Sequence, residues 1–99
     1  MKNIKEKVLE WAELRNLLHN ENALKQYSKL QEESNELLIG ILNKDPYEII
    51  DALGDIQIVL IILANQLGFD IDECLKSAYE EIKDRKGQTI DGNFVKDIK

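Results

Sequence analysis

Apolar residues recur at helical spacing from the start of the chain. Positions three or four apart form one apolar stripe: Ile4, Val8, Trp11, Ala12, Leu14 and Leu18. Asn3, with Glu6 three residues later, has the pattern of a helix N-terminus closed by a capping box. The pattern therefore predicts a first helix over about 4–18, which His19 and Asn20 interrupt.

Two longer helices are predicted next. One is expected over about 21–42, and the following one begins at Asp45 and Pro46, an N-cap followed by a proline at the first helical position. This third helix is expected to run to Gly68. Beyond Asp55 it is apolar on nearly every side, with more apolar surface than the other helices of so short a chain can cover. We therefore expect it to lie at the centre of a homo-oligomer.

The C-terminal third of the sequence combines a fourth helix with a hairpin. Asp70 and Glu73 mark the start of the helix, which is expected to run to Gly87. Residues 89–95 then surround an Asp-Gly pair, which is typical of a two-residue hairpin turn. The expected fold is one all-α domain over 1–99, with four helices and a short C-terminal hairpin.

Composition and charge exclude several classes of protein. A hydrophobic fraction of 43%, with 32% charged residues and one proline, indicates a folded soluble domain. The net charge of -6, without a basic cluster, argues against a nucleic-acid polymer or an anionic membrane as the main partner. The single cysteine, Cys74, allows no internal disulfide, and the longest apolar run is interrupted by polar residues. We expect a cytoplasmic protein.

Carboxylates break the apolar pattern on two helices. Glu33 falls in the same helical stripe as Leu30 and Leu37, so it is expected to face inward. Asp51 and Asp55, one turn apart, share an apolar stripe of the third helix. Inward carboxylates persist only if they are protonated, paired with bases or bound to a cation. A divalent metal ion is the simplest of these explanations.

The spacing of the acids favours a hard metal ion. Glu33 and Glu36 lie three residues apart, on one side of a helix, where their oxygens can hold Mg²⁺ at about 2.1 Å. With one histidine in the chain, zinc is disfavoured, and the Glu-x-x-His pairs of di-iron bundles are missing. For the neighbouring Glu32 alone, a solvated helix face is the simplest interpretation.

These motifs resemble those of a known family. Glu32-Glu33-Ser34-Asn35-Glu36, followed by Asp51-Ala52-Leu53-Gly54-Asp55, resembles the EExxE and ExxD motifs of all-α, MazG-like nucleoside triphosphate pyrophosphohydrolases. Further segments match in order: Trp11 to Arg15, Gln26, Gln66 to Gly68, and Ile82 to Gly87. The resemblance covers nearly the whole chain.

The resemblance implies Mg²⁺-dependent hydrolysis of a nucleoside triphosphate to a monophosphate and pyrophosphate. Glu33, Glu36 and Asp55 match metal-ligand positions of the family. Ala52 stands where the second motif commonly has a glutamate, and Asp51 is the natural substitute. Gln26 and Trp11 lie in the matching segments and are candidates for substrate binding, although a tryptophan in an amphipathic stripe more often packs in a core.

A second register of the ExxD motif is open. Glu48-Ile49-Ile50-Asp51 is itself a literal match. Glu48 and Asp55 lie seven residues apart, about 10.5 Å along a helix axis, which is too far to share one ion easily. Glu48 also stands where a capping box would use it. We therefore favour Asp51 and Asp55 as the metal ligands.

Other charged residues have candidate roles in the chemistry. Glu32, if it is not a ligand, can orient or deprotonate the attacking water. Three cations near the end of the fourth helix can contact phosphates or complement the helix dipole, and both interpretations are open: Lys83, Arg85 and Lys86.

The leading hypothesis is a Mg²⁺-dependent nucleotide pyrophosphohydrolase that acts as a homodimer or homotetramer of helical bundles. The rival is a non-catalytic helical oligomer that binds nucleotide or a partner protein and has lost turnover through Ala52. Release of pyrophosphate distinguishes the two.

Overall fold

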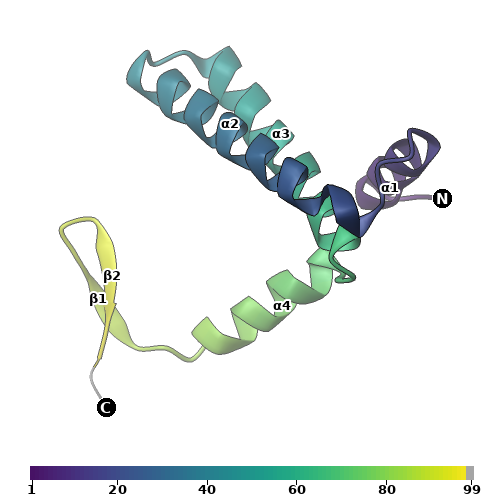
Figure 1. Ribbon diagram of the computed structural model, residues 1–99. Coiled ribbons are helices and arrows are strands. Elements are labelled where there is room, and N and C mark those ends of the chain that lie inside the picture. Colours follow the sequence, from purple (N-terminus) through teal and green to yellow (C-terminus); the bar gives the residue numbers. More distant parts are fainter. Residues whose placement is uncertain (98–99) are drawn as a thin grey trace.

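The computed structural model describes residues 1–97 and contains four helices and one β-hairpin (Figure 1). The elements are α1 (Ile4–Leu14), a 3-10 turn (Asn20–Asn22), α2 (Ala23–Leu42), α3 (Pro46–Gln66), α4 (Ile71–Ile82), β1 (Gly87–Ile90) and β2 (Asn93–Lys96). The predicted order of four helices followed by a short hairpin is confirmed.

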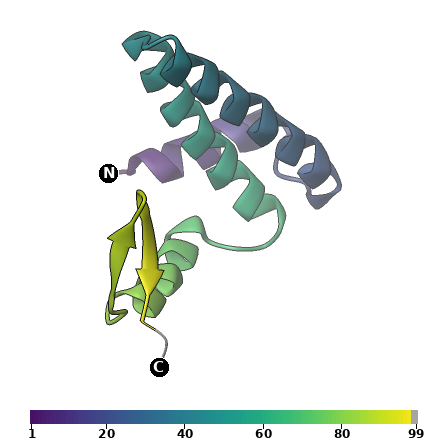
Figure 2. The same ribbon diagram turned by 90° about the vertical axis from the view of Figure 1, so that its left-hand side faces the viewer.

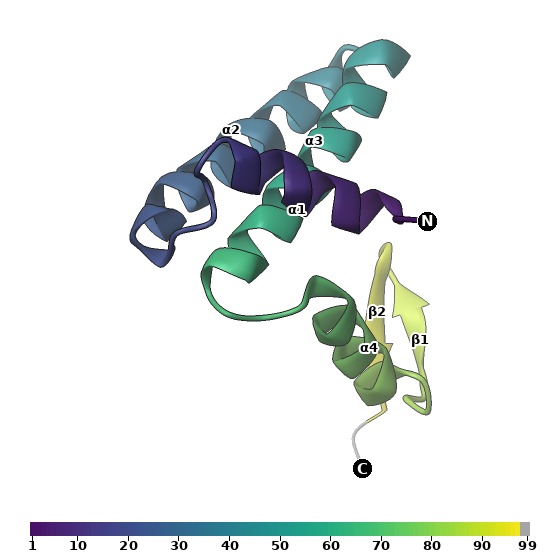
Figure 3. The ribbon, with the colours of Figure 1, turned by 90° about the vertical axis from the view of Figure 1, so that its right-hand side faces the viewer.

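The centre of the fold is the pair α2 and α3, which run antiparallel, while α1 lies across α3 (Figures 1 and 3). Four apolar residues are buried and form a small core: Ala12, Ala52, Val59 and Ile62. Near the loop that joins α2 to α3, the two helices approach closely at Gly40. A Cβ there would lie 3.0 Å from Cγ of Glu48 and 3.2 Å from Cγ1 of Ile49.

The first helix ends four residues before the predicted position. Asn16 adopts a left-handed conformation with φ of 60°, and the Leu17 N–H donates to the Ala12 carbonyl oxygen at 3.0 Å. These features close the C-terminus of α1, although the apolar stripe continues beyond it. The turn leaves the Leu17 carbonyl oxygen available to accept a hydrogen bond from another part of the chain.

The start of α3 corrects the role predicted for Glu48. The Asp45 side chain accepts hydrogen bonds from the N–H groups of Tyr47 and Glu48, at 3.1 and 3.3 Å, as an N-cap should. The N–H of Asp45, however, donates to the Gly40 carbonyl oxygen at 2.9 Å. It is therefore already satisfied, and Glu48 packs half-buried beside Gly40 without completing a capping box.

The fourth helix also ends earlier than predicted, at Ile82, because Gly87 belongs to the first strand. A Cβ on Gly87 would collide with the carbonyl oxygen of Val95 across the hairpin. The turn itself agrees with the sequence. Asp91 and Gly92 have φ values of 50° and 81°, as a two-residue Asp-Gly turn requires.

The helix α4 and the hairpin project away from the other helices, and we call residues 71–96 the C-terminal arm (Figures 2 and 3). Lys5 on α1 holds the base of this arm, because its Nζ lies 3.0 Å from Oδ1 of Asp70 and 2.7 Å from Oδ2 of Asp72. From Asp72 onward every residue of the arm is exposed.

Candidate functional site

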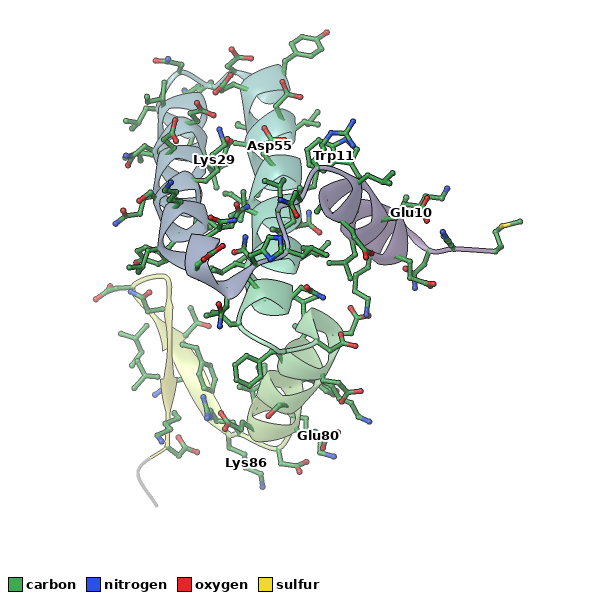
Figure 4. All side chains as sticks on the ribbon, turned by 45° about the vertical axis from the view of Figure 1, so that its right-hand side comes forward. Glu10, Trp11, Lys29, Asp55, Glu80 and Lys86 are labelled. Atoms are coloured by element: carbon green, nitrogen blue, oxygen red, sulfur yellow. The ribbon has the colours of Figure 1, made fainter. Side chains whose placement is uncertain are left out.

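A pocket of about 620 Å³ opens where α1, α2 and α3 meet, and we call it the acid pocket. Figure 4 shows Trp11, Lys29 and Asp55 on these three helices. The remaining wall is partly apolar and partly polar, formed by Leu17, Asn22, Lys25, Gln26, Glu33, Ile58, Val59, Ile62 and Gln66. A cavity of this size and mixed lining is typical of small-molecule sites.

Glu33 is the central carboxylate of the pocket. Only 4% of its surface is exposed, which confirms the inward orientation predicted from the helical stripe. Its Oε1 lies 3.4 Å from Nζ of Lys29, one turn earlier on α2. Its Oε2 is buried and has no hydrogen-bond partner in the described part of the chain. A buried acceptor without a partner costs about 1–3 kcal/mol, so this oxygen is suited to receive a donor or a cation.

Asp55 approaches the pocket from α3. The Asp55 side chain remains exposed, but its partial desolvation at the pocket wall raises the pKa of its carboxyl group above the ordinary value. The nearby negative charges of Glu33 and Asp51 raise this pKa further, while Lys29 opposes the shift. The pKa of Lys29 is itself raised, first by its hydrogen bond with Glu33. Lys29 therefore pairs with Glu33, while Asp55 has no ion-pair partner within residues 1–97, although Lys25 also lines the pocket.

The other two predicted metal ligands are less closely placed. Glu36 and Asp51 are exposed and do not line the pocket. Within residues 1–97 no three histidine, cysteine, aspartate or glutamate side chains stand together as a ready metal site. Within one chain, Glu33 and Asp55 therefore share the acid pocket, whereas Glu36 and Asp51 lie outside it.

The prediction that Asp51 and Asp55 face inward on α3 is wrong. Both Asp51 and Asp55 are exposed in the single chain. The residues of α3 that are buried are Ala52, Val59, Ile62 and Gln66. Their spacing of seven, three and four residues defines the line that faces inward, so the two aspartates flank this line. Ala52, at the glutamate position of the ExxD motif, is packed with 1% of its surface exposed.

The candidate catalytic base is also outside the pocket. Glu32 is exposed on α2 and does not line the cavity, although it is adjacent in sequence to Glu33. In the single chain, the structure therefore places Glu32 on a solvated helix face.

Two of the predicted substrate contacts do line the pocket. Gln26 is half-buried in its wall. Trp11 is 46% exposed, so it is not the core residue that the amphipathic stripe favoured. The guanidinium of Arg15 lies over its ring, 4.2 Å from the centroid, which orients the indole at the pocket.

The three predicted phosphate contacts lie elsewhere. Lys83, Arg85 and Lys86 are exposed in the C-terminal arm, and Figure 4 shows Lys86 far from Asp55 and Lys29. The Nζ of Lys83 lies 2.6 Å from a carboxylate oxygen of Glu80. Within one chain these cations do not reach the acid pocket.

Two pocket residues were not assigned a role from the sequence. Lys29 stands four residues before Glu33, and this spacing could have identified it as an ion-pair partner. Gln66 is 5% exposed, and its Nε2 donates to the Leu17 carbonyl oxygen at 2.7 Å. Its Oε1 is buried without a partner in residues 1–97. A polar residue four positions after Ile62, in the inward line of α3, was the available signal.

The donor set fits a hard divalent cation. The free Oε2 of Glu33 and the carboxylate of Asp55 are both oxygen donors, which magnesium prefers, and in residues 1–97 the pocket wall holds neither cysteine nor histidine. A bound cation would also relieve the repulsion that raises the pKa of Asp55.

No helix in residues 1–97 is both long enough and apolar enough to cross a membrane.

Comparison with known proteins assigns the chain to a family. An uncharacterized 18.2 kDa protein from the rep-hol intergenic region of Haemophilus phage HP1 is 43% identical over 61 residues, which is 62% of this chain and 37% of that protein. The chain therefore matches well under half of that relative's length. No solved structure matches. The model of the MazG-like family matches residues 1–94, and this chain therefore belongs to the MazG-like family.

Proposed function

We propose that the protein is a Mg²⁺-dependent nucleoside triphosphate pyrophosphohydrolase, which cleaves between the α and β phosphates to release a monophosphate and pyrophosphate. Membership of the MazG-like family supports this type of activity. The observation that carries the proposal is the buried Oε2 of Glu33, which has no hydrogen-bond partner in residues 1–97, while Asp55 stands nearby with a raised pKa. This arrangement is unfavourable in the protein alone and becomes favourable once a cation is bound.

In this proposal the carboxylates of the pocket would hold Mg²⁺ and would not contact the substrate directly. Glu33 and Asp55 are the first ligands, and Glu36 and Asp51 each stand within one helical turn of them on the same helix. When bound, Mg²⁺ screens the phosphate charge and withdraws electrons from the phosphorus that water attacks. Glu32 is our candidate for the group that accepts the proton of that water.

The rest of the pocket suits the nucleoside. Ile58, Val59 and Ile62 provide an apolar wall on α3, and Trp11 offers a flat ring that is half exposed. Gln26 and Gln66 add amide groups to the same wall. An apolar cavity with a few polar groups favours a base and sugar over inorganic phosphates alone.

A panel of ribonucleoside and deoxyribonucleoside triphosphates with Mg²⁺ tests this function. Pyrophosphate and monophosphate should appear in equal amounts, and chelator should stop the reaction. Release of orthophosphate with a diphosphate would indicate a different bond cleavage. No turnover of any nucleotide, by a protein that is folded in circular dichroism, would contradict the proposal.

One observation favours the rival function, a non-catalytic oligomer that binds nucleotide. Ala52 replaces the family's glutamate and is packed in the core, so the missing carboxylate has no direct counterpart at that position. Binding of a non-hydrolysable triphosphate analogue, without pyrophosphate release from the natural nucleotides, would establish this alternative.

A further inference from the structure

Gln66 carries an amide group that the chain satisfies on one side only. The residue is 5% exposed, and its Nε2 donates to the Leu17 carbonyl oxygen at 2.7 Å. Its Oε1 is buried and has no hydrogen-bond partner in residues 1–97. A buried acceptor without a partner is unfavourable, and Gln66 lines the acid pocket. A donor on a ligand bound in the pocket would complete the hydrogen bonds of this amide.

The orientation of the Gln66 amide is fixed by the Leu17 carbonyl. An amide nitrogen donates hydrogen bonds and an amide oxygen accepts them. Turning the amide over would place Oε1 against the Leu17 oxygen, so that two acceptors would face one another. The same carbonyl oxygen also accepts from the His19 N–H at 2.9 Å, and this contact holds it in the turn between α1 and α2. Gln66 therefore presents an acceptor to the pocket and cannot present a donor in its place.

This acceptor differs in charge from the other acceptor that lacks a partner. Oε2 of Glu33 belongs to a carboxylate, which suits a cation, whereas Oε1 of Gln66 is a neutral amide oxygen, which suits an N–H or O–H donor. The ionised phosphates of a nucleotide are acceptors and cannot supply that donor. In a nucleoside triphosphate the matching group therefore lies on the base or the sugar.

The pairing of α2 with α3 fixes where Gln66 lies relative to the acids. The two helices run antiparallel, and a Cβ on Gly40 would touch Glu48. Glu33 stands seven residues before Gly40. Asp55, whose pKa is raised by Glu33, stands seven residues after Glu48. The two helices therefore keep one register from their connecting loop to the acid pocket.

In this register the pocket has a charged end and an amide end. Gln66 follows Asp55 by eleven residues, which is about three helical turns and about 16 Å along the axis. Asn22, which also lines the pocket, precedes Glu33 by eleven residues and therefore lies toward Gln66. Apolar side chains line the stretch between the two ends: Ile58, Val59 and Ile62.

A nucleotide bound in the proposed way runs from the charged end to the amide end. Mg²⁺ held by Glu33 and Asp55 keeps the phosphates at the charged end, and the base extends along the apolar stretch. The exocyclic group opposite the sugar is then the part of the base that reaches Gln66. In cytosine and adenine this group is the N4 or N6 amino group, which donates, whereas in uracil and hypoxanthine it is a carbonyl oxygen, which accepts.

We propose that Gln66 selects the base of the substrate: its amide oxygen accepts a hydrogen bond from the amino group of cytosine or adenine. The protein therefore acts on nucleotides whose base carries this amino group in preference to those that carry a keto oxygen there. This inference rests on the proposed function of the acid pocket and adds the class of substrate.

Two pairs of nucleotides that differ at this group test the selection: cytidine against uridine triphosphate, and adenosine against inosine triphosphate. With Mg²⁺, kcat/KM should be at least about 10-fold higher for the amino-bearing member, because a keto oxygen would leave both acceptors without a donor. If the pocket admits one ring size only, the corresponding pair decides. Equal values would overturn the proposal and indicate a contact with water or the sugar, and a preference for the keto-bearing member would overturn it too.

Matched variants assign the selection to Gln66. Gln66→Met removes the amide and keeps an unbranched side chain, so the ratio of kcat/KM between the two members should fall to within about twofold of one. The loss should fall on the amino-bearing substrate. Gln26→Met is the control, because Gln26 lies in the same wall one turn nearer to the charged end than Asn22, and it should leave the ratio unchanged. If Gln66→Met lowers both members alike, its role is structural and the proposal is wrong.

A binding measurement separates this proposal from the proposed hydrolysis. If no nucleotide is turned over, the hydrolysis is wrong, and the Kd values of non-hydrolysable α,β-methylene analogues of the same pairs then decide the selection. The amino-bearing analogue should bind at least about 10-fold more tightly. Equal binding of the two analogues, or binding of neither, would overturn the role of Gln66. Should Gln66→Met fail to fold, the comparison of the pairs in the wild type is decisive.

Discussion

Glu33 and Asp55 are the residues whose surroundings are hardest to explain without a ligand. Glu33 is almost fully buried with one oxygen unpaired in residues 1–97, and Asp55 has a pKa raised by partial desolvation and by neighbouring carboxylates. Lys29 offsets part of this charge from a half-exposed position.

Asp55→Asn should lower pyrophosphate release by at least about 100-fold, because loss of a metal-bound carboxylate removes several kcal/mol of charge stabilisation. In chelator the same variant should melt at or above the wild-type temperature near neutral pH, since the raised pKa marks an ionised carboxylate that destabilises the fold. Turnover and thermal melting measure the two effects.

Glu48→Gln is the control for the alternative register of the second motif. Glu48 packs beside Gly40 and does not line the acid pocket. The turnover of the Glu48→Gln variant should therefore stay close to that of the wild type. If Glu48→Gln loses turnover while Asp55→Asn keeps it, the ligands are Glu48 and Asp51 and our assignment is wrong.

Mg²⁺ should stabilise the wild type by about 2–3 kcal/mol when its concentration is about 100-fold above the Kd. Glu33→Gln should lose this gain, because it removes the buried carboxylate, while its stability in chelator should change little. Glu32→Gln, at the next position, should keep the gain and lose turnover if Glu32 is the base. A large loss of stability for Glu33→Gln in chelator would instead indicate a structural ion pair with Lys29.

At the scale of elements, the joint between α1 and α4 and the packing of α2 on α3 set the geometry. Lys5 bridges α1 to the start of α4, and Gly40 lies where α2 and α3 approach closely near the loop that joins them. From each feature we expect an effect on the free energy of unfolding that does not involve the acid pocket.

The Lys5 contacts should make stability depend on pH at both extremes. The hydrogen bond from Lys5 holds the pKa of Asp70 below its ordinary 3.8, and the two aspartates raise the pKa of Lys5 to about 12. The Asp70 contribution is present above 3.8 and is lost as pH falls through the lowered pKa, and the Lys5 contribution is lost as pH rises from 10.5 through about 12. Lys5→Met should remove both losses, and Lys7→Met should keep them. Denaturant titrations across pH measure the effect, and identical profiles for wild type and Lys5→Met would contradict it.

Two glycines offer a matched test of helix packing. Gly54→Ala should stabilise α3 by about 0.5–1 kcal/mol, because a Cβ there meets nothing within 4 Å in the single chain. Gly40→Ala should gain less or destabilise, since its Cβ would press on Glu48 and Ile49 at 3.0 and 3.2 Å. Chemical denaturation compares the two, and an equal gain in both would show that α2 and α3 can separate at no cost.

At the scale of the whole molecule, the position of the C-terminal arm decides what one chain can do. The C-terminal arm carries three cations away from the acid pocket of their own chain: Lys83, Arg85 and Lys86. Because they do not reach the acid pocket of their own chain, these cations can contact a bound phosphate only from a second copy of the chain. Their contribution to phosphate binding would then be made between subunits.

Mixing two inactive variants tests this arrangement. Asp55→Asn and a triple variant, with alanine at Lys83, Arg85 and Lys86, should each lose turnover alone. Their mixture should recover about a quarter of wild-type turnover, because half of the dimers are mixed and each mixed dimer has one intact site. A mixture of Asp55→Asn with Glu33→Gln is the control and should recover nothing, since both changes lie in the same pocket. No recovery in the first mixture would show that the arm cations do not act across the dimer.

The sequence by itself determined the features that depend on neighbouring residues. The sequence predicted the helix starts at Asn3, Asp45 and Asp70, because a capping side chain lies within three residues of the N–H groups that it satisfies. The Asp-Gly hairpin and the inward orientation of Glu33 were readable for the same reason, since each follows from local spacing.

Only the tertiary structure decided which side of α3 meets α2 and where the arm points. A helical stripe is broad, so periodicity could not separate Asp51 from the adjacent Ala52, and packing selected Ala52 for the core. The apolar stripe also continued past the end of α1, because the turn at Asn16 leaves the Leu17 carbonyl oxygen to accept a hydrogen bond from Gln66, which is distant in the sequence. The meeting of Glu33 with Asp55, and the separation of both from Lys86, depend on how whole helices pack, which no local pattern encodes.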